Sequence, residues 1–206
     1  MEKNILDYYE DFADFFDDEQ QAELQDFFDS IQFKLNRTKY HFNQIKHVIR
    51  HAGDPENDNY YDEVHLPIYY EMEGFLVSLR STIDILLHLI NFTFQLGLNG
   101  YDVQLHNVYR HRKLPKALKN TFDRYTRPYN NPVWTFIYTF RNETVHEKSI
   151  HQVLPIHVDM FTDGNEPLVF FIHEDAEREI KSFFNNCIRF LETFNTQMFQ
   201  AMKISL

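Results

Sequence analysis

The stretch Phe75–Phe94 reads FLVSLRSTIDILLHLINFTF, and its apolar residues cover nearly every side of a helix. A helix that is apolar all round must be surrounded by other elements, so this stretch predicts the central helix of a helical bundle. The predicted helix extends over Glu63–Leu96. Arg80, Asp84 and His88 interrupt the apolar run, which argues against a membrane span.

Two further long helices are predicted from apolar residues at helical spacing, one over Asp18–Ile49 and a final one over Asp175–Met202. Before the final helix, Val153–Phe161 alternates between apolar and polar residues, and a turn and a second apolar run, Leu168–Ile172, follow it. We therefore expect a mainly α fold, a helical bundle of long antiparallel helices with a small β-hairpin before the last helix. We expect one domain over residues 1–206.

Cysteine content and the first residues of the chain bear on its location. Cys187 is the one cysteine, so no internal disulfide can form, and a reducing compartment is expected. The opening MEKNILDYYEDF is acidic and lacks the pattern of a signal peptide. We expect a cytoplasmic protein that is not in a membrane.

The net charge of −11 is concentrated at one end, because residues 1–29 hold eleven acidic residues and one lysine. The other 177 residues carry a net charge of −1. Three interpretations of the acidic lead-in, residues 1–17, stay open: a solvated segment, a shield that mimics RNA charge and weakens RNA binding, or a short docked helix. The docked helix would use the aromatic residues Phe12, Phe15 and Phe16.

The stretch Asn131–Lys148, NPVWTFIYTFRNETVHEK, predicts another helix, because Asn131 can cap it and Pro132 suits its first position. At helical spacing, Arg141 lies at the centre of an apolar face formed by Trp134, Ile137, Tyr138 and Val145. A buried guanidinium is costly unless it is paired. Arg141 therefore either has a carboxylate partner, as in a structural ion pair, or faces a cleft.

The six residues RNETVH, 141–146, place Asn142 directly after Arg141 and His146 five residues after it. This pattern resembles the RNxxxH signature of the HEPN superfamily, helical-bundle proteins that include many metal-independent ribonucleases. The resemblance covers roughly residues 20–203 in architecture and three residues in the motif. It departs from one toxin branch, which carries a tyrosine where this chain has Lys148.

The resemblance implies a homodimer in which two motifs face one cleft. His146 of each chain would act as base or acid, Arg141 would bind the phosphorane, and Asn142 would orient them. RNA supplies its own nucleophile, the 2′-hydroxyl, so neither a metal nor a cofactor is required, and the product would be a 2′,3′-cyclic phosphate. A role in toxin–antitoxin systems or defence, with an antitoxin or another protein partner, belongs to the same expectation.

Two carboxylates of the central helix, Glu73 and Asp84, are candidates to support Arg141 from behind the site. In the alternative interpretation, Arg80, Asp84 and His88 form a ladder at four-residue spacing that satisfies itself.

A basic segment precedes the motif helix and provides a candidate RNA-binding surface. Its cations can neutralise phosphates, and the interleaved Tyr109, Phe122, Tyr125 and Tyr129 can stack on unpaired bases. The alternative is an ordinary solvated face. The candidate residues are Arg110, Arg112, Lys113, Lys116, Lys119, Arg124 and Arg127.

The sequence thus predicts a metal-independent endoribonuclease. The alternative is a non-catalytic helical module that binds RNA, a nucleotide or a partner protein. A metalloprotein is a weaker third interpretation, because His47 and His51 lie four residues apart but lack a third ligand nearby.

Overall fold

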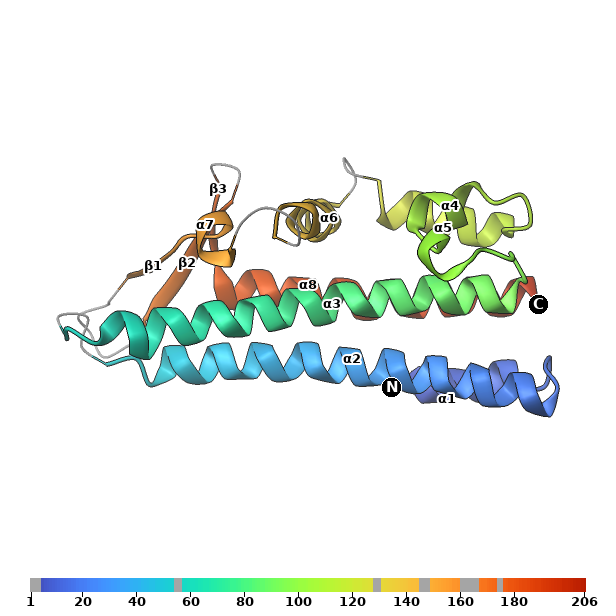
Figure 1. Ribbon diagram of the computed structural model, residues 1–206, viewed down its shortest axis with the longest axis horizontal. Helices are drawn as coiled ribbons and strands as arrows, with labels where there is room; N and C mark the ends of the chain where they lie inside the picture. Colours follow the sequence, from blue (N-terminus) through green and yellow to red (C-terminus); the bar gives the residue numbers. More distant parts are fainter. Residues whose placement is uncertain (1–4, 54–56, 128–130, 145–148, 160–166, 174–175) are drawn as a thin grey trace. The chain divides into compact units, whose positions relative to one another are not determined.

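The computed structural model describes residues 5–53, 57–127, 131–144, 149–159, 167–173 and 176–206, and of residues 141–144 it describes the backbone alone (Figure 1). Helices make up most of the described chain, and a small antiparallel sheet precedes the last helix, which confirms the predicted fold class. The chain divides into two compact units. Unit 1 comprises Met1–Asn36, Leu79–Thr135 and Phe190–Leu206, and unit 2 comprises Arg37–Ser78 and Phe136–Arg189.

The predicted long helices are present with nearly the expected bounds. Helix α2 covers Asp18–Arg50, and α3 covers Leu66–Thr93 after one π-helical turn at Tyr61–His65. The continuous helix Tyr61–Thr93 is long and apolar enough to cross a membrane by length and composition, but 61% of its most apolar window is buried in the protein. The core helix of a bundle has the same properties.

Within unit 1, α2 and α3 run antiparallel. Phe27 of α2 contacts Phe92 of α3, whereas Phe33 and Lys34, further along α2, lie beside Ile85, earlier in α3. Helix α3 ends where Gln95 adopts a left-handed backbone with φ of 46°, which breaks the helical hydrogen-bond pattern.

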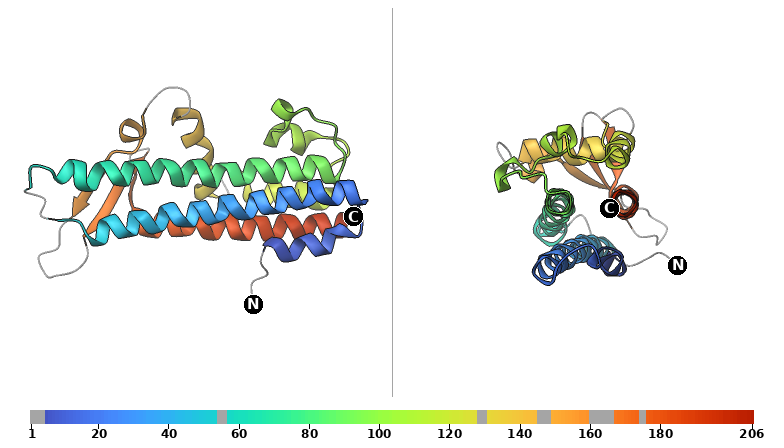
Figure 2. Two further views of the ribbon diagram at one scale, coloured as in Figure 1. Left: turned by 60° about the horizontal axis from the view of Figure 1, so that its bottom comes forward. Right: turned by 90° about the vertical axis from the view of Figure 1, so that its right-hand side faces the viewer.

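Helix α1, Ile5–Ala13, packs along the start of α2 in unit 1 (Figure 2). Phe12 is fully buried and its ring lies 5.7 Å from that of Phe28, which in turn lies 5.2 Å from Phe199 of the last helix, α8, Ile180–Ser205. The Nζ of Lys203 donates to Asp11 at 2.8 Å. The acidic lead-in therefore includes a docked helix, which rules out the solvated interpretation for residues 5–13.

The expectation that Phe12, Phe15 and Phe16 dock together is correct for two of the three. Phe16 stacks on Phe92 with ring centroids 5.5 Å apart, whereas Phe15 is 54% exposed. The chain turns after Ala13, so three aromatic residues close in sequence cannot share one buried face. That the acidic end shields RNA-binding residues stays a prediction.

Unit 2 has an aromatic core. Phe75 of α3 stacks on Phe184 of α8 with centroids 4.3 Å apart. Phe171 of strand β2, Leu168–His173, contacts Phe184 and also Phe136 of helix α6, Pro132–Thr144. The sheet and α6 are thus fixed to the same cluster of rings that joins α3 and α8.

The sheet has the order β1–β2–β3, with β1 at Ile156–Asp159, β2 at Leu168–His173 and β3 at Ala176–Glu179. Strands β1 and β2 confirm the predicted hairpin, and the predicted turn at 162–165 lies outside the described residues.

Strand β3 occupies residues that the sequence assigned to the final helix. Its residues AERE favour helices locally, but they pair antiparallel with β2, and α8 begins only at Ile180. The carboxylate of Glu179 accepts the backbone N–H groups of Lys181 at 2.9 Å and Ser182 at 2.6 Å. Strand pairing and this cap together set the helix start five residues later than predicted.

The docking of α1 leads to a first prediction. Phe12→Ala should lower the free energy of unfolding by about 3–5 kcal/mol, because it leaves a cavity among Phe28 and its neighbours. Phe15→Ala, the matched control, should change it by less than about 0.5 kcal/mol. Denaturant unfolding measures both, and equal effects of the two variants would contradict the docked arrangement.

Candidate functional site

The motif helix α6 begins as the sequence predicts. The Oδ1 of Asn131 accepts the backbone N–H groups of Val133 at 3.0 Å and Trp134 at 3.3 Å, so its side chain caps the helix. Within unit 1, the ring of Trp134 lies 6.4 Å from each of Phe190 and Phe194 of α8. The start of the motif helix is therefore fixed by hydrogen bonds and by packing.

The buried face of α6 differs from the predicted one. Tyr138 was expected on that face but is 48% exposed, and Val145 lies outside the described residues. Phe136 and Phe140 lie four residues apart on nearly one side of the helix, about opposite Tyr138, and their purely apolar rings take the buried positions instead. Among the side chains of α6 that the structure describes, the buried ones are Trp134, Phe136, Ile137 and Phe140.

The three motif residues lie at the end of this helix and beyond it. The backbone of Arg141 and Asn142 belongs to α6, but their side chains are outside the described part of the chain, and His146 is outside it altogether. Their mutual geometry therefore remains a prediction.

The two carboxylates expected behind Arg141 have different surroundings. Asp84 forms an ion pair with Arg80, in which Nη2 and Oδ1 lie 2.9 Å apart, as the first step of the predicted ladder requires. The second step of that ladder, from Asp84 to His88, stays a prediction. Both residues belong to unit 1, whereas Glu73 belongs to unit 2 together with Arg141. Glu73 is exposed and lines a hollow with Tyr69 and Tyr70. Whether either carboxylate contacts Arg141 remains a prediction.

The structure brings the seven basic candidates together on one segment of unit 1, helix α4 (Leu105–Arg110), the turn after it, and helix α5 (Lys116–Tyr125) with its following residues. Six of them are exposed, and Lys119 is half-buried. We refer to residues 105–127 as the basic segment. Its exposure is what phosphate contacts require.

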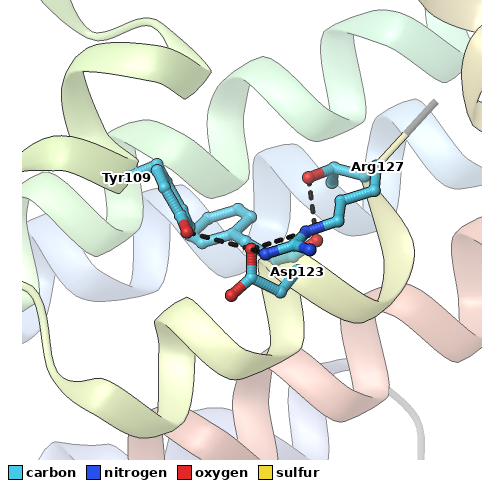
Figure 3. A network of polar contacts seen from close by, with 5 residues as sticks. Tyr109, Asp123 and Arg127 are labelled. Carbon is cyan, nitrogen blue, oxygen red and sulfur yellow. Dashed lines mark hydrogen bonds and ion pairs between the residues drawn. The ribbon is translucent and has the colours of Figure 1, made fainter.

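Some of these cations also stabilise the segment. Arg127 donates to Oδ1 of Asp123 from Nη2 at 2.9 Å and from Nε at 3.1 Å, and the hydroxyl of Tyr109 donates to the same oxygen at 2.9 Å (Figure 3). The network ties α4 to the end of α5. Asp123 orients the guanidinium of Arg127. The Arg127 side chain is still 61% exposed, so it remains accessible to a ligand.

The hydrogen bond from Tyr109, and next the one from Arg127, lower the pKa of the Asp123 carboxyl below its usual value of 3.8. The ionised carboxylate is therefore the form that the fold favours.

Two more cations lie around an open hollow of about 540 Å³, which is lined by Arg110, His111, Arg112 and Asp102 among others. Lys113 instead donates from Nζ to the carbonyl oxygen of Gln95 at 2.8 Å, beyond the end of α3, where a cation also suits the helix dipole.

The interleaved aromatic residues are mostly not available to stack on bases. Phe122 is fully buried, Tyr125 packs on Phe190 and Phe194, and Tyr109 is held by Asp123. Helix α5 needs an apolar face to dock, and these rings provide it. Tyr129 lies outside the described residues.

Sequence reasoning missed two features. Tyr101 is 96% exposed and directly precedes Asp102 of the hollow, so its ring is accessible to a ligand, although a single tyrosine forms no sequence pattern. In unit 2, His41 links α2 to α3, because its Nδ1 lies 2.6 Å from Glu71 and its Nε2 accepts from Nε of Arg37 at 3.3 Å. Gly74 allows this close approach, since a Cβ at that position would clash with the His41 ring.

In the described part of the chain, no group of three His, Cys, Asp or Glu side chains converges to form a set of metal ligands. His47 and His51 lie with ring centroids 4.2 Å apart, and Nδ1 of His51 is 2.8 Å from the carbonyl oxygen of His47. That contact engages one ring nitrogen of the pair with the helix backbone.

No family model, no curated protein and no solved structure matches this chain. The resemblance to the HEPN superfamily therefore rests on the motif and its position.

The Asp123 network leads to a prediction about pH. A carboxyl whose pKa is lowered on folding contributes stability above its usual pKa, and that contribution disappears as the pH falls through the lowered value. Asp123→Asn should lower the melting temperature at pH 7 by no more than about 4 °C, and the difference from wild type should shrink below about pH 3.8. Asp14→Asn, an exposed charge-matched control, should show no such difference at pH 7, and a D123N deficit that persists at pH 2 would contradict the network's role.

Proposed function

We propose that this protein is a metal-independent endoribonuclease of the HEPN type, which cleaves RNA with the 2′-hydroxyl of the RNA as nucleophile. One observation carries the proposal: the RNETVH sequence begins on α6, a capped helix packed by its apolar face in a helical bundle. The packing of Trp134 and Phe136 supports the proposal, because it holds the helix that carries the motif.

In the proposed reaction, the 2′-oxygen attacks the adjacent phosphorus and the bond to the 5′-oxygen breaks. One His146 removes the proton from the 2′-hydroxyl, and a second His146 protonates the departing 5′-oxygen. The guanidinium of Arg141 binds the non-bridging phosphate oxygens as charge develops on them, and Asn142 orients these groups. The products are a 2′,3′-cyclic phosphate and a 5′-hydroxyl.

Each chain carries one motif, so the proposal includes a homodimer in which two chains supply the two histidines. The exposed cations of the basic segment would bind the RNA backbone. A cytoplasmic toxin or defence enzyme, restrained by an antitoxin or another protein partner, is the cellular role that we propose. Lys148 makes control through a tyrosine at that position inapplicable.

A second candidate function is RNA binding without cleavage. The basic segment favours it, because Arg127 is both oriented by Asp123 and exposed, whatever the chemistry at the motif. The two candidate functions differ in whether RNA is cut, so an assay of RNA cleavage separates them.

We predict that the pure protein cleaves single-stranded or looped RNA in the presence of EDTA. His146→Ala should lower the rate by about 10²–10⁴-fold, which is the usual contribution of general acid–base catalysis. His51→Ala, at an exposed position just after α2 and outside the basic segment, is the matched control and should cut at the wild-type rate. Gel analysis of labelled RNA measures the rate of cleavage by the wild-type protein and by both variants.

Two results would contradict the enzyme. One is RNA that stays intact while it binds the wild-type protein, which would favour the binding module. The other is cleavage by H146A at the wild-type rate.

A further inference from the structure

A small hollow in unit 2 lies between helix α3 and the start of helix α7, Ile150–Val153. Its volume is about 250 Å³. Tyr69, Tyr70 and Glu73 line it from α3, and Ser149 and His151 line it from the other side. Pockets for drug-sized ligands are larger, roughly 300–1,000 Å³, so this one suits a group of the size of a single nucleobase.

The walls of the hollow combine fixed rings with an exposed carboxylate. The hydroxyl of Tyr69 accepts the backbone N–H of Ile156 at 2.9 Å, and burial raises the pKa of this tyrosine, so it stays neutral. The His151 ring meets Tyr69 edge-on at 6.1 Å, and its Nε2 lies 3.3 Å from Oγ of Ser149. Tyr70 is 63% exposed and the Glu73 side chain is exposed. A flat ring and a carboxylate are therefore both accessible to a ligand.

The hollow is also close to the motif along the chain. Residues 145–148 alone separate the end of α6 at Thr144 from Ser149. Because consecutive Cα atoms lie about 3.8 Å apart, the Cα of Ser149 is within about 11 Å of the Cα of His146 in any conformation. A base next to a phosphate held by the motif is within that reach.

We propose that this hollow binds one unpaired guanine base of the RNA beside the cleaved phosphate. The inference rests on the proposed ribonuclease function and extends it to base preference. The Watson–Crick edge of guanine carries two adjacent N–H donors, N1–H and N2–H, which match the two oxygens of the Glu73 carboxylate. Adenine, cytosine and uracil each place an acceptor beside their donor, which a carboxylate repels. The ring of Tyr70 provides a surface for stacking.

Binding of short RNA tests the proposal without cleavage. Fluorescence anisotropy would compare an A-only hexanucleotide with the same hexanucleotide carrying one central G, using full-length protein with His146→Ala. We expect the G-containing RNA to bind at least about fivefold more tightly, as one bidentate base contact implies. Adding Glu73→Gln should abolish the preference for the G-containing RNA, because an amide presents one acceptor and one donor.

A charge-matched control separates base recognition from general repulsion of RNA. Glu63→Gln removes an exposed carboxylate from the helical turn just before α3, so it should strengthen binding of both hexanucleotides and leave their ratio unchanged. Tyr70→Ala should weaken binding of both RNAs. Equal affinity for the two hexanucleotides, or a G preference that survives Glu73→Gln, would overturn the proposal.

Mapping of cleavage ends distinguishes this inference from the proposed function. If the wild-type protein cuts RNA with no preference for G, and E73Q cuts at the same positions, the base site fails while the ribonuclease stands. If the Glu73-dependent preference for G is present in binding but no RNA is cut, the ribonuclease fails while the base site stands.

Discussion

The face-to-face contact between Phe75 of α3 and Phe184 of α8, with ring planes 10° from parallel, holds unit 2 together. From Phe184 the ring contacts continue to Phe171 of strand β2, and from there to Phe136 of α6. Each fully buried aromatic ring removes much apolar area from water, so these rings contribute strongly to the free energy that stabilises the folded unit. The helix that carries the motif is one of the elements that this chain fixes.

The long helices could be predicted from the sequence because their signal is local and repeats over many turns. The predicted start of α2 at Asp18 coincides with the observed one, and the observed end, Arg50, is one residue beyond the prediction. Features that depend on distant partners could not be predicted this way. Strand β3 exists because β2 offers an edge for pairing, and Tyr138 is exposed because Phe136 and Phe140 take the buried side.

The candidate site shows the same division. The sequence identifies the basic segment by composition, and the structure confirms that most of its cations are exposed. The sequence does not reveal that Phe122 belongs to the core, or that Asp123 orients Arg127, since both facts depend on how α4 and α5 pack. The motif residues themselves were identified from their spacing, and their chemistry remains a proposal.

The measurement that tests the central claim most directly uses an RNA with one 2′-deoxy substitution at a mapped cleavage position. If the 2′-hydroxyl is the nucleophile, cleavage at that position must stop, because no oxygen is left to attack the phosphorus, while cleavage at unmodified positions continues. Our account predicts this selective loss in the presence of EDTA. Continued cleavage at the 2′-deoxy position would show that water or a protein side chain attacks instead, and would contradict the proposed mechanism.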